Sequence, residues 1–485
     1  MPTDTPLIAP RDGITYLPHQ EEGVRWMLER EDENARVCRG GVLADDMGLG
    51  KTFQTIGLIK NSDPLTTLIV CPPALVAGWT DELEACGFFV RSLVNGSSVW
   101  ITVPAAKAEL PTVYLCTYPK MQMYAAKLRD EKFQRVILDE GHSIRNGKAT
   151  KRWWAAMAVA KRSLCRWILS ATPVQNGASD WTDLCWWLRV KCQATDIPQL
   201  ASFLMLRRTM DDLRDVIKAL PPSPRFISHD LSIPEDSAEG KLFRALNQQL
   251  ESVMNKSGIS GVVKLELYLR IQQFMVHPQL YIEGMRRKFQ GAYPRPDWTG
   301  TAAKWDCFSG RLAESVQKKI PTIVFCNFAA EMDMVEKKVG ELGGKSWSVR
   351  GGMTPAAIGD SVASAKKAAV EGEEGVVIVV QIVSGGAGLN LQFCRRILFL
   401  SQHWNPAVVH QAVGRAVRIG QPAVVDIHLF RIVDGVMDNI DRIMVQKHIT
   451  KIAAAQELCP SLYDSYEDVE AELQAFEDIE GADSD

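Results

Sequence analysis

Residues 45–52 read Asp45-Asp46-Met47-Gly48-Leu49-Gly50-Lys51-Thr52, between an apolar run at 41–44 and a helix-like run at 53–59. This order predicts a strand, a glycine-rich turn and a helix start. Glycines let the backbone curl so that its N–H groups face a polyphosphate, and the helix N-terminus adds partial positive charge. Lys51 is expected to contact the β and γ phosphates of a nucleotide, and the Thr52 hydroxyl to hold Mg²⁺. The alternative is a turn without a ligand, because the strict phosphate-loop pattern has glycine in place of Asp45.

A buried-strand pattern at 136–138 ends on two adjacent carboxylates, Asp139 and Glu140. At the end of a strand, neighbouring side chains point in different directions. One carboxylate can then bind the metal while the other activates a water for attack on the γ phosphate. An acidic pair after a strand is also typical of a solvated turn. Its position after Lys51 in the chain favours a site over a turn, and we assign Asp139 to Mg²⁺ and Glu140 to the base.

The segment 411–421 places two arginines, Arg415 and Arg418, three residues apart. If the segment is helical, both guanidinium groups lie on one face. They could then reach one triphosphate and stabilise the charge of its transition state, an effect worth about a thousandfold in rate. The alternative is a basic surface helix that contacts solvent or phosphate.

The composition is that of an ordinary globular protein, with 485 residues, 46% hydrophobic and 23% charged. The apolar run 376–380 is too short to span a bilayer, and the polar start 1–12 has no signal-peptide core. Eleven cysteines include no Cys-x-x-Cys pair, so no zinc site is expected. Residues 461–485 carry ten acids and no base, which changes the net charge from −3 for the whole chain to +7 for the rest. This predicts a solvated acidic tail.

Short apolar strand patterns alternate with helical patterns, which predicts an α/β fold with parallel sheets. The strand patterns form two blocks, at 68–71, 113–116, 136–138 and 167–169, and at 322–325, 376–380, 397–400 and 424–427. The predicted domains are 1–209, a charged helical insertion or hinge at 210–300, 301–455, and the acidic tail at 456–485.

The motifs taken together resemble the Swi/Snf type of superfamily-two helicase-related ATPase, from Tyr16 to Gln446. The matching segments are 17–20 with 23–27, 45–52, 68–73 with Trp79, 117–118, 138–142 with 144–146, 169–176, 206–208, 323–328, 384–391, 404–406 and 411–421. The wording at 41–47 and 139–142 is similar to the branch of the helicase-like transcription factor and the post-replication-repair translocases. That branch often carries a RING, but the region 176–322 has only three cysteines (Cys185, Cys192 and Cys307), so ubiquitin ligase activity is not implied.

The resemblance implies two tandem RecA-like lobes that bind ATP with Mg²⁺ and act as a DNA-dependent ATPase. It implies that Gln20 contacts adenine and that His142 connects the ATP site to the coupling loop without a catalytic role. The nucleotide-binding residues would be Gln20, Asp46, Met47, Gly48, Leu49, Gly50, Lys51 and Thr52, and the coupling residues Ser170, Thr172 and Gln411. The DNA contacts would be Pro72, Thr117, Tyr118, Asn327, Gly386 and Asn390.

The implied function is ATP-driven translocation on double-stranded DNA that remodels protein–DNA complexes in chromatin, transcription or repair. Nucleosomes or DNA-bound proteins would be further partners of a monomer located in the nucleus, or in a nucleoid or viral factory. Two alternatives stay open: a strand-separating DNA or RNA helicase, and a nucleotide-gated scaffold without turnover. The scaffold is suggested by departures from the family pattern in the second lobe, such as Ser401 in place of the usual Asp.

Overall fold

The computed structural model of the chain describes residues 6–32, 38–93, 111–175, 177–254, 256, 258–372, 374–382 and 389–433, together with 441, 448 and 451. These residues form two compact units that divide between Leu220 and Pro221, and each unit has its own sheet. Gly386 and the expected acidic tail at 456–485 lie outside the described residues.

The first unit contains a seven-stranded sheet in the order β3-β4-β2-β5-β6-β1-β7, in which every paired strand is parallel. Its strands are β1 (Gly40–Leu43), β2 (Thr67–Cys71), β3 (Phe89–Leu93), β4 (Thr112–Thr117), β5 (Arg135–Asp139), β6 (Cys165–Leu169) and β7 (Met205–Leu206). The expected α/β class is confirmed. The sequence did not predict β3 and β7, because edge strands are short or mixed in polarity and lack the continuous apolar run of a strand buried on both faces.

Helices cover this sheet and bury its apolar side chains. They are α1 (Pro18–Glu31), α2 (Lys51–Asn61), α3 (Val76–Ala85), α4 (Tyr118–Met123), α5 (Ala125–Asp130), α6 (Lys151–Val159), α7 (Ala178–Trp187) and α8 (Ile197–Leu204). Met27 of α1, Ile56 of α2 and Trp79 of α3 share one core cluster with Ile137 and Trp167 of the sheet. This packing fixes the carboxyl end of β1, where the glycine-rich turn begins, relative to the end of β5.

A buried ion pair connects the last residue of α1 to the sheet. Arg135 is fully buried, and its guanidinium donates to both carboxylate oxygens of Glu31. The indole N–H of Trp167 donates to the same carboxylate at 2.7 Å. Both charges are out of water, so each depends on the other for compensation.

We expect Glu31→Ala to lower the free energy of unfolding by about 3 kcal/mol or more, because it leaves the Arg135 charge buried without a counter-ion. Urea unfolding followed by circular dichroism measures the loss. Glu29→Ala is the matched control, since Glu29 lies in the same helix and is exposed. Equal stability of the two variants would contradict the account of this ion pair.

The second unit contains a six-stranded parallel sheet in the order β10-β11-β9-β12-β13-β8. Its strands are β8 (Arg225–Leu231), β9 (Thr322–Cys326), β10 (Lys345–Val349), β11 (Val376–Gln381), β12 (Arg396–Phe399) and β13 (Asp426–Ile432). Its helices are α9 (Ala238–Met254), α10 (Gly261–Val276), α11 (Pro278–Lys288), α12 (Ala303–Gln317), α13 (Ala329–Glu341), α14 (Pro355–Glu371) and α16 (Pro406–Val413). None of the helices within the described ranges combines the length and apolar character needed to cross a membrane.

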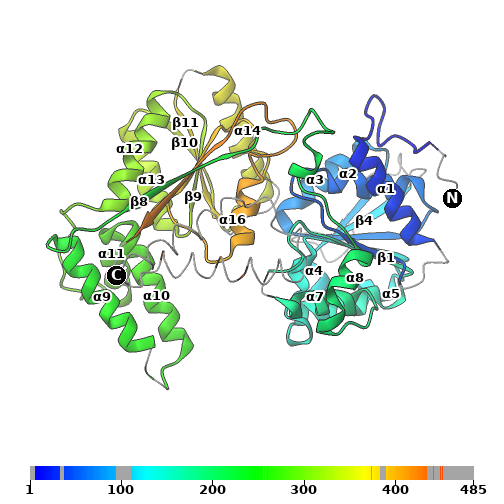
Figure 1. Cartoon of the computed structure of the whole chain (residues 1–485), viewed down its shortest axis with the longest axis horizontal. Helices are drawn as coiled ribbons and strands as arrows, with labels where there is room; N and C mark the ends of the chain where they lie inside the picture. The colour runs from blue at the N-terminus through cyan, green and yellow to red at the C-terminus, as the bar shows by residue number, and fades with distance from the viewer. Residues whose placement is uncertain are drawn as a thin grey trace, which may run out of the picture. The chain divides into compact units, whose positions relative to one another are not determined.

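The segment expected to be a helical insertion contains α9, α10 and α11, which lie together at the lower left of Figure 1. It also contains β8, which the sequence did not predict. This strand pairs with β13 from Arg225 opposite Asp426 to Leu231 opposite Ile432. Its sequence mixes polar and apolar residues, as expected of an edge strand. The helices and Ile432 share one core cluster, so this segment packs on the second sheet. The predicted domain boundaries stay predictions.

Candidate active site

The glycine-rich turn follows β1 and leads directly into α2, which begins at Lys51. Gly48 and Gly50 both have φ of +85°, a conformation that residues with a Cβ rarely adopt. A Cβ on Gly50 would also lie 2.4 Å from Nε2 of Gln20. The two glycines therefore permit both the turn and the close packing of α1 behind it.

Residues of α1 support the turn from behind. Nε2 of Gln20 donates to the carbonyl oxygen of Leu49 at 3.3 Å, and Nε2 of His19 lies 2.8 Å from the same oxygen. Burial lowers the pKa of His19. The structure thus brings Gln20 to the loop, while its expected contact with adenine stays a prediction.

Lys51 lies among acidic and carbonyl groups at the start of α2. Its ammonium group donates to the carbonyl oxygens of Asp45 at 2.6 Å and Asp46 at 3.1 Å. Burial lowers the pKa of Lys51, and the nearby carboxylates, of which Glu140 acts most strongly, oppose that shift. An ammonium group held by carbonyl oxygens beside a phosphate-loop turn is able to exchange these oxygens for those of a phosphate. In the same segment Met47 is buried and Thr52 is partly buried.

Arg207 and Arg208 hold the turn in place, a role that the sequence did not predict for them. Arg208 donates to both oxygens of the fully buried Asp45, at 3.0 and 2.6 Å. Arg207 donates to the Asp46 carboxylate at 2.9 Å. This explains the departure at position 45, where Asp replaces the glycine of the strict pattern. An adjacent pair of acids and an adjacent pair of arginines, each beside apolar strands, was a signal that these charges need partners.

Asp139 and Glu140 lie where β5 ends, at the same carboxyl edge of the sheet as the glycine-rich turn. The carboxylate of Asp139 accepts hydrogen bonds from the indole N–H of Trp79 at 2.7 Å and the Glu140 amide at 3.0 Å. Burial and the charge of Glu140 raise the pKa of Asp139 to about 6, against the opposing effects of Trp79 and Lys51. Burial makes the charged form of this carboxylate less stable, and a bound cation would stabilise it, which suits a metal ligand.

Glu140 adopts a left-handed backbone conformation, with φ of +51°, which separates its side chain from that of Asp139. Its Oε2 lies 3.3 Å from Nδ1 of His142, and the same nitrogen lies 3.2 Å from Oγ of Ser170. Oγ of Ser170 accepts a hydrogen bond from the amide of Thr172. A path of direct contacts therefore runs from the expected base to the expected coupling residues.

The expected DNA contacts differ in their exposure. Thr117 and Tyr118 are buried, at 1% and 2% exposure. Oγ1 of Thr117 accepts a hydrogen bond from the amide of Lys120, and the Tyr118 hydroxyl donates to the carbonyl oxygen of Asp139 at 2.8 Å. Because both side chains are buried, a DNA contact by these two residues would have to use their backbone at the start of α4. This contact stays a prediction. Pro72 is partly exposed.

In the second unit, Asn390 is exposed, whereas Asn327 lies at the end of β9 and its side-chain amide donates to the carbonyl oxygen of Gln402 at 2.8 Å. The backbone N–H of Asn327 and the hydroxyl of Ser401 both donate to Oε2 of the fully buried Glu331. Burial raises the pKa of Glu331 to about 7. This accounts for the departure at position 401, because an Asp there would place a second carboxyl group against Glu331.

A carboxyl group whose pKa rises on folding stabilises the protein at low pH, and this stabilisation is lost as the pH rises through the folded pKa. For Glu331 the window runs from 4.5 to about 7. We expect Glu331→Gln to reduce the difference in unfolding free energy between about pH 5 and pH 8 by about 2 kcal/mol. Urea unfolding at both pH values measures it. Glu341→Gln, an exposed change in the same helix, is the control, and a Glu331→Gln variant with wild-type pH dependence would refute the assignment.

The segment that carries Arg415 and Arg418 is not a helix. The helix that would have placed both guanidinium groups on one face is therefore absent, and this part of the sequence prediction was wrong. α16 contains Gln411 and ends at Val413, and Arg415 and Arg418 lie in the turns that follow. The side-chain amide of Gln421 donates to the carbonyl oxygens of Gln392 and Cys394, which ties these turns to the chain before β12. The glycine at 414 and the tertiary bonds of Gln421 override the helical pattern.

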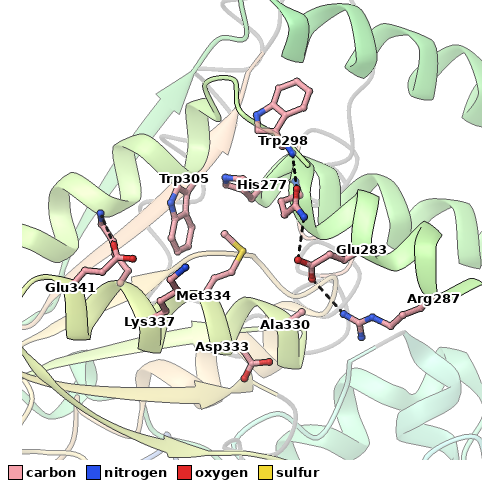
Figure 2. A pocket seen from close by; sticks show the side chains of 12 residues that line it. His277, Glu283, Arg287, Trp298, Trp305, Ala330, Asp333, Met334, Lys337 and Glu341 are labelled. Carbon is pink, nitrogen blue, oxygen red and sulfur yellow. Dashed lines mark hydrogen bonds and ion pairs between the residues drawn. The ribbon is translucent and has the colours of Figure 1, made fainter. Parts of the chain in front are cut away.

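A separate cavity of about 430 Å³ lies in the second unit between α11, α12 and α13 (Figure 2). In its lining, the rings of His277 and Trp305 meet edge to face with their centroids 5.9 Å apart (Figure 2). Its three carboxylates are paired with cations, namely Glu283 with Arg287, Asp333 with Arg350 and Glu341 with Lys338. It includes none of the predicted site residues.

Two parallel-sheet units in tandem, the first with a phosphate loop at the carboxyl edge of its sheet, form the architecture of helicase-like ATPases, and this chain is an enzyme of that class. Residues 19–254 match the SNF2-related domain, and residues 304–420 match the helicase conserved C-terminal domain. The chain belongs to the SNF2 family.

Relatives from viruses, bacteria and eukaryotes match over much of the chain. The probable global transactivator of Orgyia pseudotsugata multicapsid polyhedrosis virus is 26% identical over 94% of this chain and 94% of its own length. The putative ATP-dependent helicase/translocase YwqA of Bacillus subtilis is 23% identical over 91% of this chain, and DNA repair protein RAD5B of Arabidopsis thaliana is 29% identical over 50%. The chain spans 49% and 24% of those two proteins. The SWI2/SNF2 ATPase core of Sulfolobus solfataricus in complex with dsDNA is 20% identical, with a TM-score of 0.39 over 96% of this chain and 98% of that one.

Proposed function

We propose that this ATPase moves along double-stranded DNA and uses ATP hydrolysis to remodel protein–DNA complexes in chromatin, transcription or repair. The observation that carries the proposal is the contact path from Glu140 through His142 to Ser170, which joins the expected hydrolytic base to a segment that can respond to a second ligand. The names of two relatives, DNA repair protein RAD5B and TATA-binding protein-associated factor MOT1, support the choice of DNA. A nuclear location, or a nucleoid or viral factory, follows from that partner and stays a prediction.

In this proposal Asp139 and Thr52 would hold Mg²⁺. Asp139 lies near enough to Lys51 for their charges to interact, and Thr52 follows Lys51 in the first turn of α2. When bound, the metal ion neutralises charge on the phosphate oxygens. In our proposal Lys51 exchanges the carbonyl oxygens of Asp45 and Asp46 for those of the β and γ phosphates. Glu140 orients the attacking water and accepts its proton.

Arg418 is the residue of the second unit that best suits a transition-state contact. It is partly buried, and its side chain makes no hydrogen bond or ion pair with another described residue. Burial lowers its pKa, and no carboxylate opposes this shift. A partly buried cation without an anion is unfavourable unless a ligand supplies one. We propose that Arg418, with Arg415, binds the γ phosphate when the two lobes close, and that Gln411 couples closure to DNA.

ATPase assays with duplex DNA, single-stranded DNA and RNA test the function. We expect duplex DNA to stimulate turnover most, with little dependence on its sequence and a strong dependence on salt. A preference for RNA or single strands would favour a strand-separating helicase. Glu140→Gln distinguishes an active ATPase from a scaffold without turnover. In an active ATPase, loss of the general base slows turnover by about a hundredfold or more. Equal background rates in the wild type and this variant would favour a scaffold without turnover.

A further inference from the structure

A polar cavity of about 380 Å³ lies in the first unit beside the acidic motif. Every residue that lines it has a polar side chain, and none of these side chains is a carboxylate. The lining residues are Gln122, His142, Ser143, Arg145, Asn146, Thr150, Lys151 and Arg152. Arg145, Lys151 and Arg152 give the cavity three positive charges, so it is suited to an anion.

Neutral groups hold two of these cations in place. The guanidinium of Arg145 donates to the side-chain oxygen of Gln175, and Nε of Arg152 donates to Oε1 of Gln122 at 3.4 Å. Arg152 also lies over the ring of Tyr118 at 5.6 Å. These contacts fix the direction of the side chains without neutralising their charge.

The positive charges in the cavity repel one another. Burial and the charge of Arg152 lower the pKa of Arg145, against the attraction of Asp180, a buried residue that is not part of the lining. Lys151 and Arg152 also occupy the first turn of α6, where the helix dipole disfavours cations. The next two cations, Lys161 and Arg162, follow the other end of the same helix, where the dipole favours them. An arrangement that raises the energy of the empty cavity is relieved when an anion binds.

His142 connects this cavity to the ATP site. It lines the cavity, and its Nδ1 lies 3.3 Å from Oε2 of Glu140 and 3.2 Å from Oγ of Ser170. A ligand that contacts His142 from the cavity would therefore be separated from Glu140, the proposed base, by His142 alone.

We propose that this cavity binds a phosphate group of the nucleic-acid backbone and that His142 conveys its occupation to Glu140. The proposal rests on the function proposed above and adds to it the site through which DNA stimulates hydrolysis. Gln122, Ser143, Asn146 and Thr150 supply neutral donors around the three cations, which suits a phosphodiester oxygen without selecting a base sequence.

The test compares two double variants of the full chain that each remove two cations from the same helix region. Lys151→Ser with Arg152→Ser alters the cavity, and Lys161→Ser with Arg162→Ser is the matched control at exposed positions. For the cavity variant, we expect the concentration of duplex DNA that gives half-maximal ATPase stimulation to rise about tenfold or more. The slope of log affinity against log salt should become less steep by about 0.9, the value for one phosphate contact. The control should match the wild type.

Three outcomes would count against parts of this account, and they can be distinguished. A cavity variant that binds and responds to DNA as the control does would overturn the inference and leave the proposed function intact. A wild type that duplex DNA does not stimulate would instead overturn the proposed function. Stimulation of the wild type by millimolar inorganic phosphate alone would assign the cavity to a free anion and overturn the nucleic-acid assignment.

His142 is a positioning residue in this proposal, and its effect on signalling is separable from its effect on folding. We expect His142→Ala to weaken DNA binding much less than Lys151→Ser with Arg152→Ser does, while DNA stimulation of turnover falls about tenfold or more. His142→Gln keeps one donor and one acceptor and should restore part of the stimulation. A His142→Ala variant with full stimulation would overturn the link to Glu140, and so would one that loses DNA affinity and stimulation together.

Discussion

Arg418→Ala is expected to lower the ATP turnover number by about a thousandfold while ATP binding is retained, since an arginine that contacts the γ phosphate in the transition state contributes about that factor. Because the residue lies outside the phosphate loop, its loss removes none of the ground-state contacts made by Lys51. Steady-state hydrolysis with duplex DNA measures turnover, and equilibrium binding of a fluorescent ATP analogue measures affinity.

Arg395→Ala is the control for this experiment, since Arg395 is an exposed arginine of the same unit. It should hydrolyse ATP at the wild-type rate. Arg418→Lys adds a further comparison, because lysine keeps the charge but lacks the planar fork of a guanidinium. Normal hydrolysis by Arg418→Ala would show that the assignment of this arginine is wrong.

Lys51→Ala is expected to abolish measurable ATP binding and hydrolysis with little change in thermal stability. The variant removes the ammonium group that would contact the β and γ phosphates. It also removes two hydrogen bonds to the carbonyl oxygens of Asp45 and Asp46 and relieves the burial of a cation, and these two effects on stability oppose one another.

The same helix offers a matched control, Lys60→Ala. Lys60 lies near the other end of α2 and also donates to two carbonyl oxygens, those of Pro10 and Cys86. This variant should keep ATP affinity and hydrolysis, so the comparison separates the loss of two such hydrogen bonds from the loss of a phosphate contact. If Lys51→Ala still bound ATP as well as Lys60→Ala does, the phosphate-loop assignment would fail.

The sequence was sufficient to predict the central strands and the position of the expected site residues at the carboxyl ends of those strands. Strands such as β5 and β9 are buried on both faces, so they are continuous apolar runs, and the residues that follow them lie at one edge of a parallel sheet. The edge strands β3, β8 and β10 mix polar and apolar residues, β7 has only two residues, and none of these four strands was predicted. Their identity depends on pairing with distant strands, which periodicity within one segment does not reveal.

The partners of the site residues were less predictable than the residues themselves. The bonds from Arg208 to Asp45 and from Trp79 to Asp139 join positions 163 and 60 residues apart. Thr117 and Tyr118 were expected at a DNA surface because of the family resemblance, yet their side chains are buried. The helical spacing of Arg415 and Arg418 was also misleading, since tertiary bonds determine the turns after α16.

The ion pairs between the glycine-rich turn and the arginines at 207–208 connect the expected phosphate site to a distant part of the chain. Asp45 and Asp46 hold Lys51 through their carbonyl oxygens and hold Arg208 and Arg207 through their carboxylates. Exchange of those carbonyls for phosphate oxygens would therefore be transmitted to the segment that directly follows β7. The two residues that would respond to a bound phosphate are therefore also the two that hold Arg207 and Arg208.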